Sequence, residues 1–149
     1  FALGAHVNTD GLEITGIQVE LGTVTEFEHR SFGEELTLCQ RYFSKSYDYD
    51  VAPATSGTVV GSVAIRNGPV TITGSPFWHI DFPVSMRDNP TVTTFDNAGN
   101  SGKVNGPSNA SIASTTYHKG TSGFNVENTS GSSVSSGDYY CNWQAVSEL

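Results

Sequence analysis

The chain has 149 residues, of which 36% are hydrophobic and 16 are glycines, and its formal net charge at pH 7 is −8. A domain of this length buries about two thirds of its unfolded surface, and a modest apolar fraction with frequent glycine is typical of a turn-rich β-protein that also hides apolar surface by association. The negative charge is concentrated in residues 1–35, which carry −6. Because phosphate backbones and anionic lipids attract clustered Lys and Arg, this balance argues against nucleic acid and membrane surfaces as partners.

The first predicted element is a strand between Gly11 and Gly22, where apolar residues alternate with polar ones. The apolar residue Leu12 has an even residue number, whereas from Ile17 onward the apolar residues have odd residue numbers. A period of two indicates a half-buried strand, and the change of phase predicts a β-bulge at Gly16.

A short helix is predicted next, near residues 32–42. Ser31 and Glu34 have the spacing of a capping box. Four apolar residues follow one helical face at the i, i+4, i+7 and i+11 positions: Phe32, Leu36, Cys39 and Phe43. This pattern predicts two to three turns of amphipathic helix.

After the helix the alternation of apolar residues returns and persists to the end of the chain. The alternating residues are Val59, Val63, Ile65, Val70, Ile72, Trp78, Ile80, Phe82, Val84, Val92, Phe95, Phe124, Val126, Tyr139, Cys141, Trp143 and Ala145. Turn-forming clusters of Asn, Gly, Ser and Pro separate these runs, and residues 97–137 are predicted to form loops and edge strands. The pattern predicts an all-β fold, an antiparallel β-sandwich of jelly-roll type with the one short helix.

Two cysteines, Cys39 and Cys141, are too few for a disulfide framework, and their spacing matches no metal motif. We expect both to be buried thiols that pack as small hydrophobic residues. There is neither a run of about 18 apolar residues nor a basic-then-apolar leader, so we expect no membrane insertion and no signal peptide. The chain opens at Phe1 without methionine, as an excised fragment or a proteolytic product would.

Five segments carry a more specific signal. They are a strand at Thr15–Gly22, a Thr-x-Phe-Glu-x-Arg element at Thr25–Arg30, a Glu-Leu-x-x-Cys-Gln-Arg-Tyr helix at Glu35–Tyr42, a Phe-Pro-Val-x-Met-Arg strand at Phe82–Arg87, and a Trp-x-Ala-x-x-Glu-Leu ending at Trp143–Leu149. Together they resemble the C-terminal module of bacteriophage tail fibres and tailspikes.

The resemblance implies a homotrimeric module at the distal end of a virion appendage, which serves attachment to a bacterial cell-surface glycan, trimer stabilisation, or both. Residues 1–31 would be a neck or the last strands of an upstream jelly roll, and residues 32–149 the terminal sandwich. Three copies around an axis would bury the apolar helix, which is unstable alone. A carbohydrate-binding module of a glycan-active enzyme and a pure assembly domain remain open alternatives.

Five residues of the predicted helix are the candidates for the trimer interface: Glu35, Leu36, Gln40, Arg41 and Tyr42. Arg41 follows two acidic residues, Glu34 and Glu35, and its planar guanidinium suits an ion pair across subunits. Direct contact with a ligand is the alternative for this side chain.

Sugar recognition needs aromatic faces together with carboxylates, amides or imidazoles that bind hydroxyl groups. Alternation of aromatic and acidic residues is found in one short segment, which comprises Tyr47, Asp48, Tyr49 and Asp50. In an extended segment both tyrosines would share one side and form a sugar platform. An edge strand whose tyrosines pack on a neighbour is the alternative.

A second candidate segment is residues 77–82. Alternation assigns Trp78, Ile80 and Phe82 to one face, which is predicted to be core, and His79 and Asp81 to the other. A histidine beside a carboxylate can bind a hydroxyl group, so Trp78, His79 and Asp81 join the sugar-binding candidates.

Metal binding and catalysis have weaker support. Asp48 with Asp50, and Asp96 with Asn97 and Asn100, lack the EF-hand spacing and fall short of the six to eight oxygens that calcium needs. The sequence has no Gly-x-Ser-x-Gly elbow and no His-x-x-x-His pattern. We therefore expect a non-enzymatic protein with no cofactor, no metal and no catalytic residues.

Overall fold

The computed structural model describes residues 6–8, 11–13, 19, 21–23, 25–26, 29–67, 77–129 and 136–147, with the backbone alone described at 6–8, 11–13, 65–67 and 77. The chain divides into two compact units, Phe1–Phe32 and Gly33–Leu149. In the first unit, β1 (His6–Asn8) pairs antiparallel with β2 (Gly11–Glu13). The bulge predicted at Gly16 lies outside the described residues.

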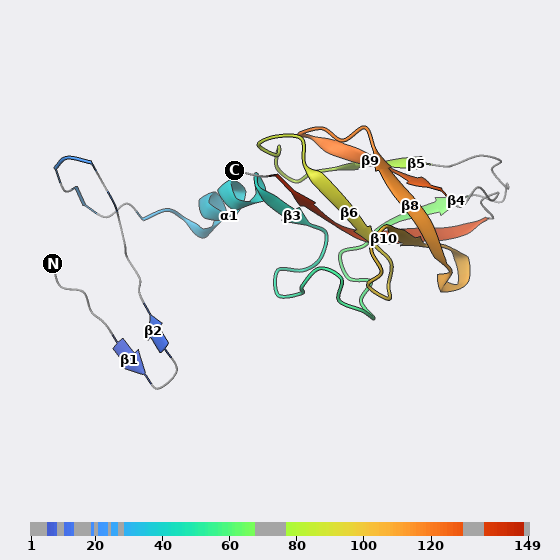
Figure 1. Cartoon of the computed structure of the whole chain (residues 1–149), viewed down its shortest axis with the longest axis horizontal. Helices are drawn as coiled ribbons and strands as arrows, with labels where there is room; N and C mark the ends of the chain where they lie inside the picture. The colour runs from blue at the N-terminus through green and yellow to red at the C-terminus, as the bar shows by residue number, and fades with distance from the viewer. Residues whose placement is uncertain are drawn as a thin grey trace. The chain divides into compact units, whose positions relative to one another are not determined.

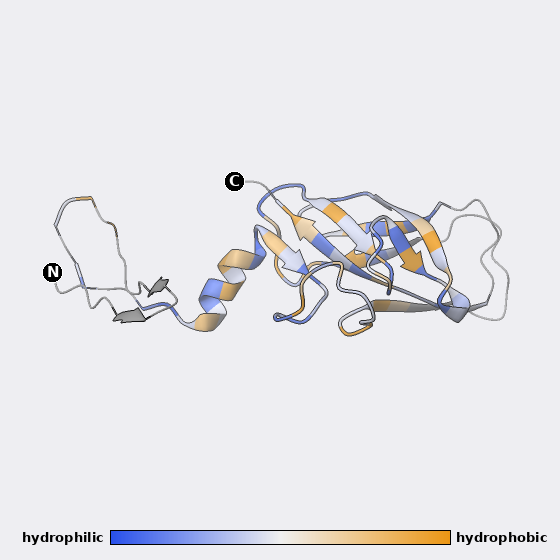
Figure 2. Ribbon diagram, turned by 60° about the horizontal axis from the view of Figure 1, so that its bottom comes forward, coloured by the Kyte–Doolittle hydropathy of each residue, from blue (hydrophilic) through white to orange (hydrophobic). Residues whose placement is uncertain are grey.

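The predicted helix is confirmed as α1 (Phe32–Gln40). Its first turn carries Glu34 and Glu35, whose negative charge is favourable at a helix N-terminus. The helix ends in a turn where the Tyr42 N–H donates to the Cys39 carbonyl oxygen at 3.0 Å. No residue of α1 is buried, and the helix ribbon in Figure 2 alternates between hydrophobic and hydrophilic residues. The expectation that Cys39 is buried is therefore wrong, because the helix face that carries it is uncovered.

The longest strand, β10 (Gly137–Val146), is flanked on both sides along most of its length. Its second half lies between β3 (Phe43–Lys45) and β6 (Thr91–Phe95), since Gln144 is paired with a residue of each. Its first half pairs with β4 (Val63–Asn67) and, at Tyr140, with β7 (Lys103–Asn105). The predicted alternation along β10 is confirmed, because Tyr139, Cys141, Trp143 and Ala145 are all buried.

The sheet continues from β7 through β8 (Ser111–Tyr117) and β9 (Gly123–Asn128) to β5 (Phe77–Asp81), and every pairing is antiparallel. A single 3₁₀ turn, Pro107–Asn109, joins β7 to β8. The eight described strands of this unit form one curled antiparallel sheet (Figure 1). The prediction of an all-β fold with one short α-helix is confirmed.

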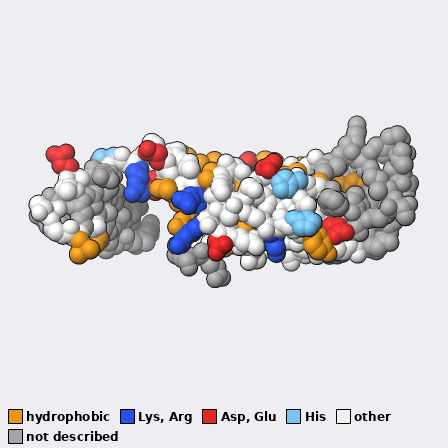
Figure 3. All heavy atoms as spheres, turned by 90° about the horizontal axis from the view of Figure 1, so that it is seen from above, with side chains coloured by type: hydrophobic (Ala, Val, Ile, Leu, Met, Phe, Trp, Pro, Cys, Tyr) orange, Lys and Arg blue, Asp and Glu red, His pale blue; other side chains and the backbone are white. Residues whose placement is uncertain are grey.

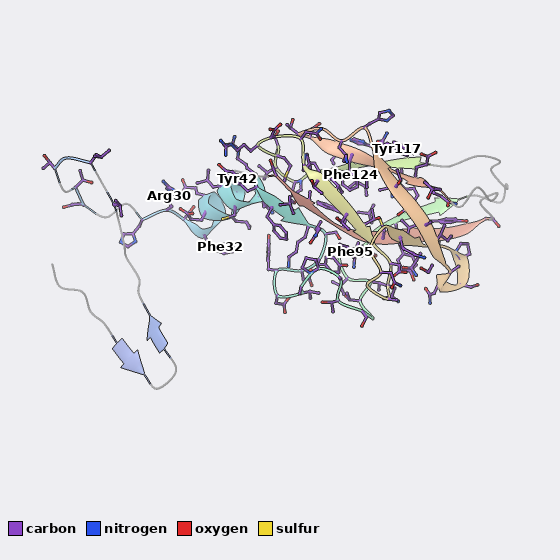
Figure 4. All side chains as sticks on the ribbon, in the orientation of Figure 1. Arg30, Phe32, Tyr42, Phe95, Tyr117 and Phe124 are labelled. Carbon is purple, nitrogen blue, oxygen red and sulfur yellow. The ribbon has the colours of Figure 1, made fainter. Side chains whose placement is uncertain are left out.

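The core fills the inside of the curl. The rings of Phe82, Phe124 and Trp143 meet pairwise with centroids 5.5 Å apart, and Phe124 lies among the strands in Figure 4. Around them the buried side chains are Trp78, Ile80, Met86, Val92, Val104, Val126, Tyr139, Cys141 and Ala145. Such aromatic clusters supply much of the burial energy of a small domain.

Strand β5 is shorter than predicted, because it ends at Asp81 rather than continuing to Val84. Pro83 has no N–H to donate to a ladder, which is why the strand stops. Phe82 and Met86 still bury their side chains, and their N–H groups donate to Ser122 and Thr121 carbonyl oxygens at 2.8 and 2.7 Å. The predicted core face of Trp78, Ile80 and Phe82 is thereby confirmed.

Candidate functional site

The two tyrosines of residues 47–50 do not form an exposed pair. Tyr47 is buried, lies edge-on to Phe95 at 6.2 Å, and its hydroxyl accepts the Ala54 N–H at 3.2 Å. Burial is the largest influence on the Tyr47 hydroxyl and raises its pKa. Tyr49, by contrast, is 71% exposed.

This arrangement arises because β3 ends at Lys45 and the chain then folds into a loop. The Lys45 ammonium donates to the carbonyl oxygens of Tyr49 at 3.1 Å and Val51 at 2.6 Å. Residues 47–50 are therefore not extended, and the expected alternation of faces is lost. Asp48 and Asp50 are exposed in the same loop, so Tyr49 is the one aromatic residue of this segment whose ring a sugar can reach.

Residues 78–81 follow the predicted alternation. Trp78 is buried in the core, so its ring offers no surface to a ligand. His79 and Asp81 lie on the opposite, outer face, where the His79 Nε2 is 3.1 Å from the Asp81 Oδ1 and the two side chains are 53% and 84% exposed. An ion pair so exposed contributes little to stability, so its importance lies in holding the imidazole in place.

The strand register extends this outer face over three strands. Asn125 of β9 is directly opposite His79 of β5 and also directly opposite Tyr117 of β8. Directly opposite residues share a face of the sheet, so His79, Asn125 and Tyr117 form one row. Glu127 lies two residues along β9 from Asn125 and shares its face.

Hydrogen bonds join His79 to Asn125, and Asn125 to His118 outside the row. The His79 Nδ1 is 2.7 Å from the Asn125 Oδ1, and the Asn125 Nδ2 is 3.2 Å from the Nδ1 of His118, which directly follows β8. His118 has a positive φ of 45°, an uncommon conformation for a non-glycine residue. The Tyr117 and His118 ring centroids are 6.5 Å apart.

Tyr117, His118, Asn125 and Glu127 line a hollow of about 240 Å³, here called the polar hollow. Figure 3 looks down on this face and shows two histidine side chains gathered beside acidic and apolar side chains. Tyr117, labelled in Figure 4, is 45% exposed. The polar hollow thus combines an aromatic ring with an imidazole, an amide and a carboxylate.

Gly123 of β9 makes room for this arrangement. A Cβ atom at this position would lie 2.8 Å from the His79 Nε2 and 2.5 Å from the Ile80 carbonyl oxygen. Only a residue without a side chain therefore leaves room for the His79 ring where it reaches Asp81. His79 is held on three sides, by Asn125, Asp81 and the Gly123 backbone.

Sequence reasoning identified His79 and Asp81 but missed the four residues that line the polar hollow. Residues 97–137 were predicted only as loops and edge strands, and Tyr117, His118, Asn125 and Glu127 carried no functional signal within them. Their proximity depends on the pairing of β8 and β9 with β5, and the sequence separation of about forty residues hides it. One local signal could have pointed to this turn, namely the pair of Tyr117 and His118 just before Lys119 and Gly120.

The residues predicted to form a subunit interface lie on α1 and in the turn that follows it. Glu35 and Arg41 are exposed, whereas Leu36, Gln40 and Tyr42 are half-buried. The Tyr42 carbonyl oxygen accepts the Ser147 N–H at 2.8 Å, and the Arg87 guanidinium lies 5.5 Å from the centre of the Tyr42 ring. The end of the helix is thus fastened to the sheet.

The described residues offer neither a metal site nor a helix that could span a membrane. They contain no group of three or more His, Cys, Asp and Glu side chains arranged to hold a metal ion. Both carboxylate oxygens of Asp96, a residue considered for calcium, accept hydrogen bonds from the protein. No helix in the described part has the length and hydrophobicity needed to cross a bilayer.

Comparison of the chain with protein-family models, with curated proteins and with solved structures gives no match in any of the three.

Proposed function

We propose that this chain is a non-enzymatic attachment domain that binds a bacterial cell-surface glycan in the polar hollow. The observation that carries the proposal is the row of His79, Asn125 and Tyr117 across β5, β9 and β8, with Glu127 beside it. A tyrosine ring packs on the C–H face of a pyranose, while amide, imidazole and carboxylate groups bind its hydroxyls.

The openness of this face supports binding rather than catalysis. A glycosidase acid is enclosed by apolar groups and is paired with a second carboxylate at a defined separation. Asp81 is almost fully exposed, and one of its oxygens is engaged by His79. We propose that the carboxylates of Asp81 and Glu127 hold the ligand and His79 rather than transfer protons.

A matched pair of tyrosine variants tests where the glycan binds. Tyr117→Ala removes the ring that lines the polar hollow, and Tyr49→Ala removes a more exposed ring in the 46–62 loop. On an array of bacterial surface polysaccharides, Tyr117→Ala should lower binding about tenfold or more, the value of one stacked ring, and Tyr49→Ala should leave it unchanged. The reverse pattern would move the site to the loop, and an array without any bound glycan would refute the proposal.

We also propose that the domain is the tip of a tail fibre or tailspike in the virion, a jelly-roll-like sandwich that assembles as a homotrimer around α1. Support comes from the five sequence segments named above and from the state of the helix. A nine-residue helix with no buried residue is not expected to be stable by itself in water.

The uncovered apolar surface extends beyond the helix. Phe43 and Val146 are directly paired between β3 and β10, and both side chains are substantially exposed, as is Leu38 of α1. Within the described residues β3 pairs only with β10, so its other edge is open. A second copy of the chain that meets this surface would cover the apolar side chains and the open strand edge together.

Light scattering with a charge variant tests the assembly. Leu38→Glu, on α1, should convert trimer to monomer, whereas Val60→Glu, a similarly exposed position in the 46–62 loop, should leave the trimer intact. A wild-type chain that is monomeric at micromolar concentration would refute the trimer. A monomer that still binds glycan would instead indicate a carbohydrate-binding module of a glycan-active enzyme, and a trimer that binds none a pure assembly domain.

A further inference from the structure

One of the residues that line the polar hollow, Glu127, carries a carboxylate that no other group engages. Its side chain is half-buried, and within the described residues it forms neither an ion pair nor a hydrogen bond. Other acids of this unit have partners: Asp81 is bound by His79, and both oxygens of Asp96 accept hydrogen bonds. Because withdrawing a charge from water without a partner is costly, the Glu127 carboxylate is a strong acceptor for a group that a ligand brings.

The strands beside Glu127 do not supply a compensating charge. The residues directly opposite it are Phe77 of β5 and Thr115 of β8, and neither is ionisable. The nearest Lys or Arg in the sequence is Lys119, which lies beyond the end of β8, on the far side of Tyr117 from Thr115. It forms no ion pair with Glu127. The described part of this face therefore leaves the carboxylate with its full negative charge.

An aromatic ring lies next to this carboxylate. Tyr117 is directly opposite Asn125, and Glu127 is two residues further along β9, so Glu127 and Tyr117 are diagonal neighbours on one face of the sheet. Diagonal neighbours are about 7–8 Å apart, which is within reach of an aromatic side chain. A carboxylate and a tyrosine ring both attract a cation, the first by its charge and the second by its quadrupole. The two side chains are thus placed to share one positively charged group.

We propose that the glycan bound in the polar hollow contains an amino sugar, whose ammonium group lies between the Glu127 carboxylate and the Tyr117 ring. This ligand class rests on the proposed function, the binding of glycan in the same hollow. An ammonium group brings three donors and a positive charge to an acceptor that lacks both. A neutral sugar binds more weakly, because its hydroxyl makes a hydrogen bond in which only one partner is charged. An acidic sugar binds most weakly, since it meets Glu127 with like charge.

The charge of the whole chain acts in the same direction. Its formal net charge of −8 at pH 7 attracts cationic polysaccharides and slows the approach of acidic ones. Salt screens this long-range effect, with a Debye length of about 8 Å at physiological ionic strength, but screens a partly buried pair much less. Binding measured at physiological salt therefore reports mainly the local contact with Glu127.

Chemical N-acetylation supplies matched ligands, because it converts each ammonium group into a neutral acetamide. Polysaccharides that bind on the array of bacterial surface glycans would be measured before and after acetylation. With the wild type, acetylation should weaken binding about tenfold, the value of one hydrogen bond to a charged group. With Glu127→Gln the two forms should bind equally. With the control Asp50→Asn, which removes the same charge from an exposed turn, the tenfold difference should remain.

The outcomes separate the ligand class from the site. Glu127→Gln should keep the wild-type unfolding midpoint, because no described group binds this carboxylate, so that lost discrimination reports the charge. Bound glycans without free amino groups, or wild-type binding that acetylation does not weaken, would overturn the amino-sugar ligand and leave the glycan site standing. Discrimination that persists in Glu127→Gln would overturn the role of Glu127.

Absence of all polysaccharide binding would refute the proposed function, and single sugars would then test the ammonium site alone. In NMR titrations, D-glucosamine should shift the backbone amides of Tyr117 and Glu127 at concentrations where D-glucose does not. This difference should vanish in Glu127→Gln and persist in Asp50→Asn. Equal shifts with the two sugars, or none with either, would overturn the ammonium site.

Discussion

Replacing Asp96 by asparagine removes a charge from the most heavily hydrogen-bonded side chain of the β6–β7 turn. Asp96 is 2% exposed. Its Oδ1 accepts the N–H groups of Ala98 and Asn100 at 3.0 and 2.9 Å, and its Oδ2 accepts the Ser111 hydroxyl at 2.5 Å and the Asn100 amide at 2.9 Å. An asparagine that keeps its oxygen toward the N–H groups sets its own NH₂ against the Asn100 amide.

The expected loss follows from these contacts. The bond from the Asn100 amide is broken, the Ser111 hydroxyl must change from donor to acceptor, and the two bonds at Oδ1 change from a charged to a neutral acceptor, a difference of roughly 1 kcal/mol each before relaxation. We expect Asp96→Asn to lower the free energy of unfolding by about 3 kcal/mol at pH 7, or about 1.5 M in the urea midpoint for an m-value of about 2 kcal/mol/M. Fluorescence of the buried Trp78 and Trp143 reports unfolding. The control Asp50→Asn, in an exposed turn, should shift the midpoint little.

The same variant has a defined pH dependence. Burial acts to raise the pKa of Asp96, but the hydrogen bonds from Ser111, Asn100 and Ala98 outweigh it, so the pKa lies below its ordinary value. A lowered carboxyl pKa stabilises the fold above the unfolded value of about 4 and loses this contribution as the pH falls through the folded value. The stability gap between wild type and Asp96→Asn should therefore be constant from pH 7 to about pH 5 and shrink below about pH 4. A loss under about 0.5 kcal/mol, or a gap that widens in acid, would refute this reasoning.

Three further predictions concern the core, the cysteines and the site. Phe124→Ala, at a fully buried ring between Phe82 and Trp143, should cost about 3–5 kcal/mol in urea unfolding, and a cost under about 1 kcal/mol would mean that the aromatic cluster is not the core. In the monomeric Leu38→Glu variant a thiol reagent should label Cys39 and leave Cys141 unreacted, since burial raises the pKa of Cys141 to about 12; rapid labelling of both would contradict the fold. Gly123→Ala should weaken glycan binding and also lower the thermal midpoint, because its Cβ would meet His79 and the Ile80 carbonyl; unchanged binding would show that His79 does not contribute.

The elements that the sequence predicts well are those whose apolar residues recur with a regular period. In β5 and β10 the inward positions are apolar throughout, and α1 has both a capping pattern and an apolar helical face. Strand β8 is different, because its inward residues include Ser114, which is buried and hydrogen-bonds Thr94 at 2.9 Å. Because these two buried hydroxyl groups bind each other, Ser114 can occupy an inward position of β8, and the sequence of β8 then lacks the hydrophobic period that predicts a strand.

The candidate site was predictable only in part, for a related reason. His79 and Asp81 lie on one strand, so their common face follows from the period of two. Asn125 and Tyr117 join them through register, which depends on turn geometry and on pairing between distant segments. Tyr47 was misjudged because local alternation cannot reveal the Lys45 hydrogen bonds that fold its loop and bury its ring.

The central claim is that the polar hollow binds a glycan, and a map of backbone amide shifts tests it most directly. The ¹⁵N-labelled chain would be titrated with neutral and acidic bacterial surface polysaccharides. The account predicts saturable shifts centred on Tyr117, His118, Asn125 and Glu127 and nearly absent from the 46–62 loop. Shifts centred on that loop, or no shift with any polysaccharide, would contradict it.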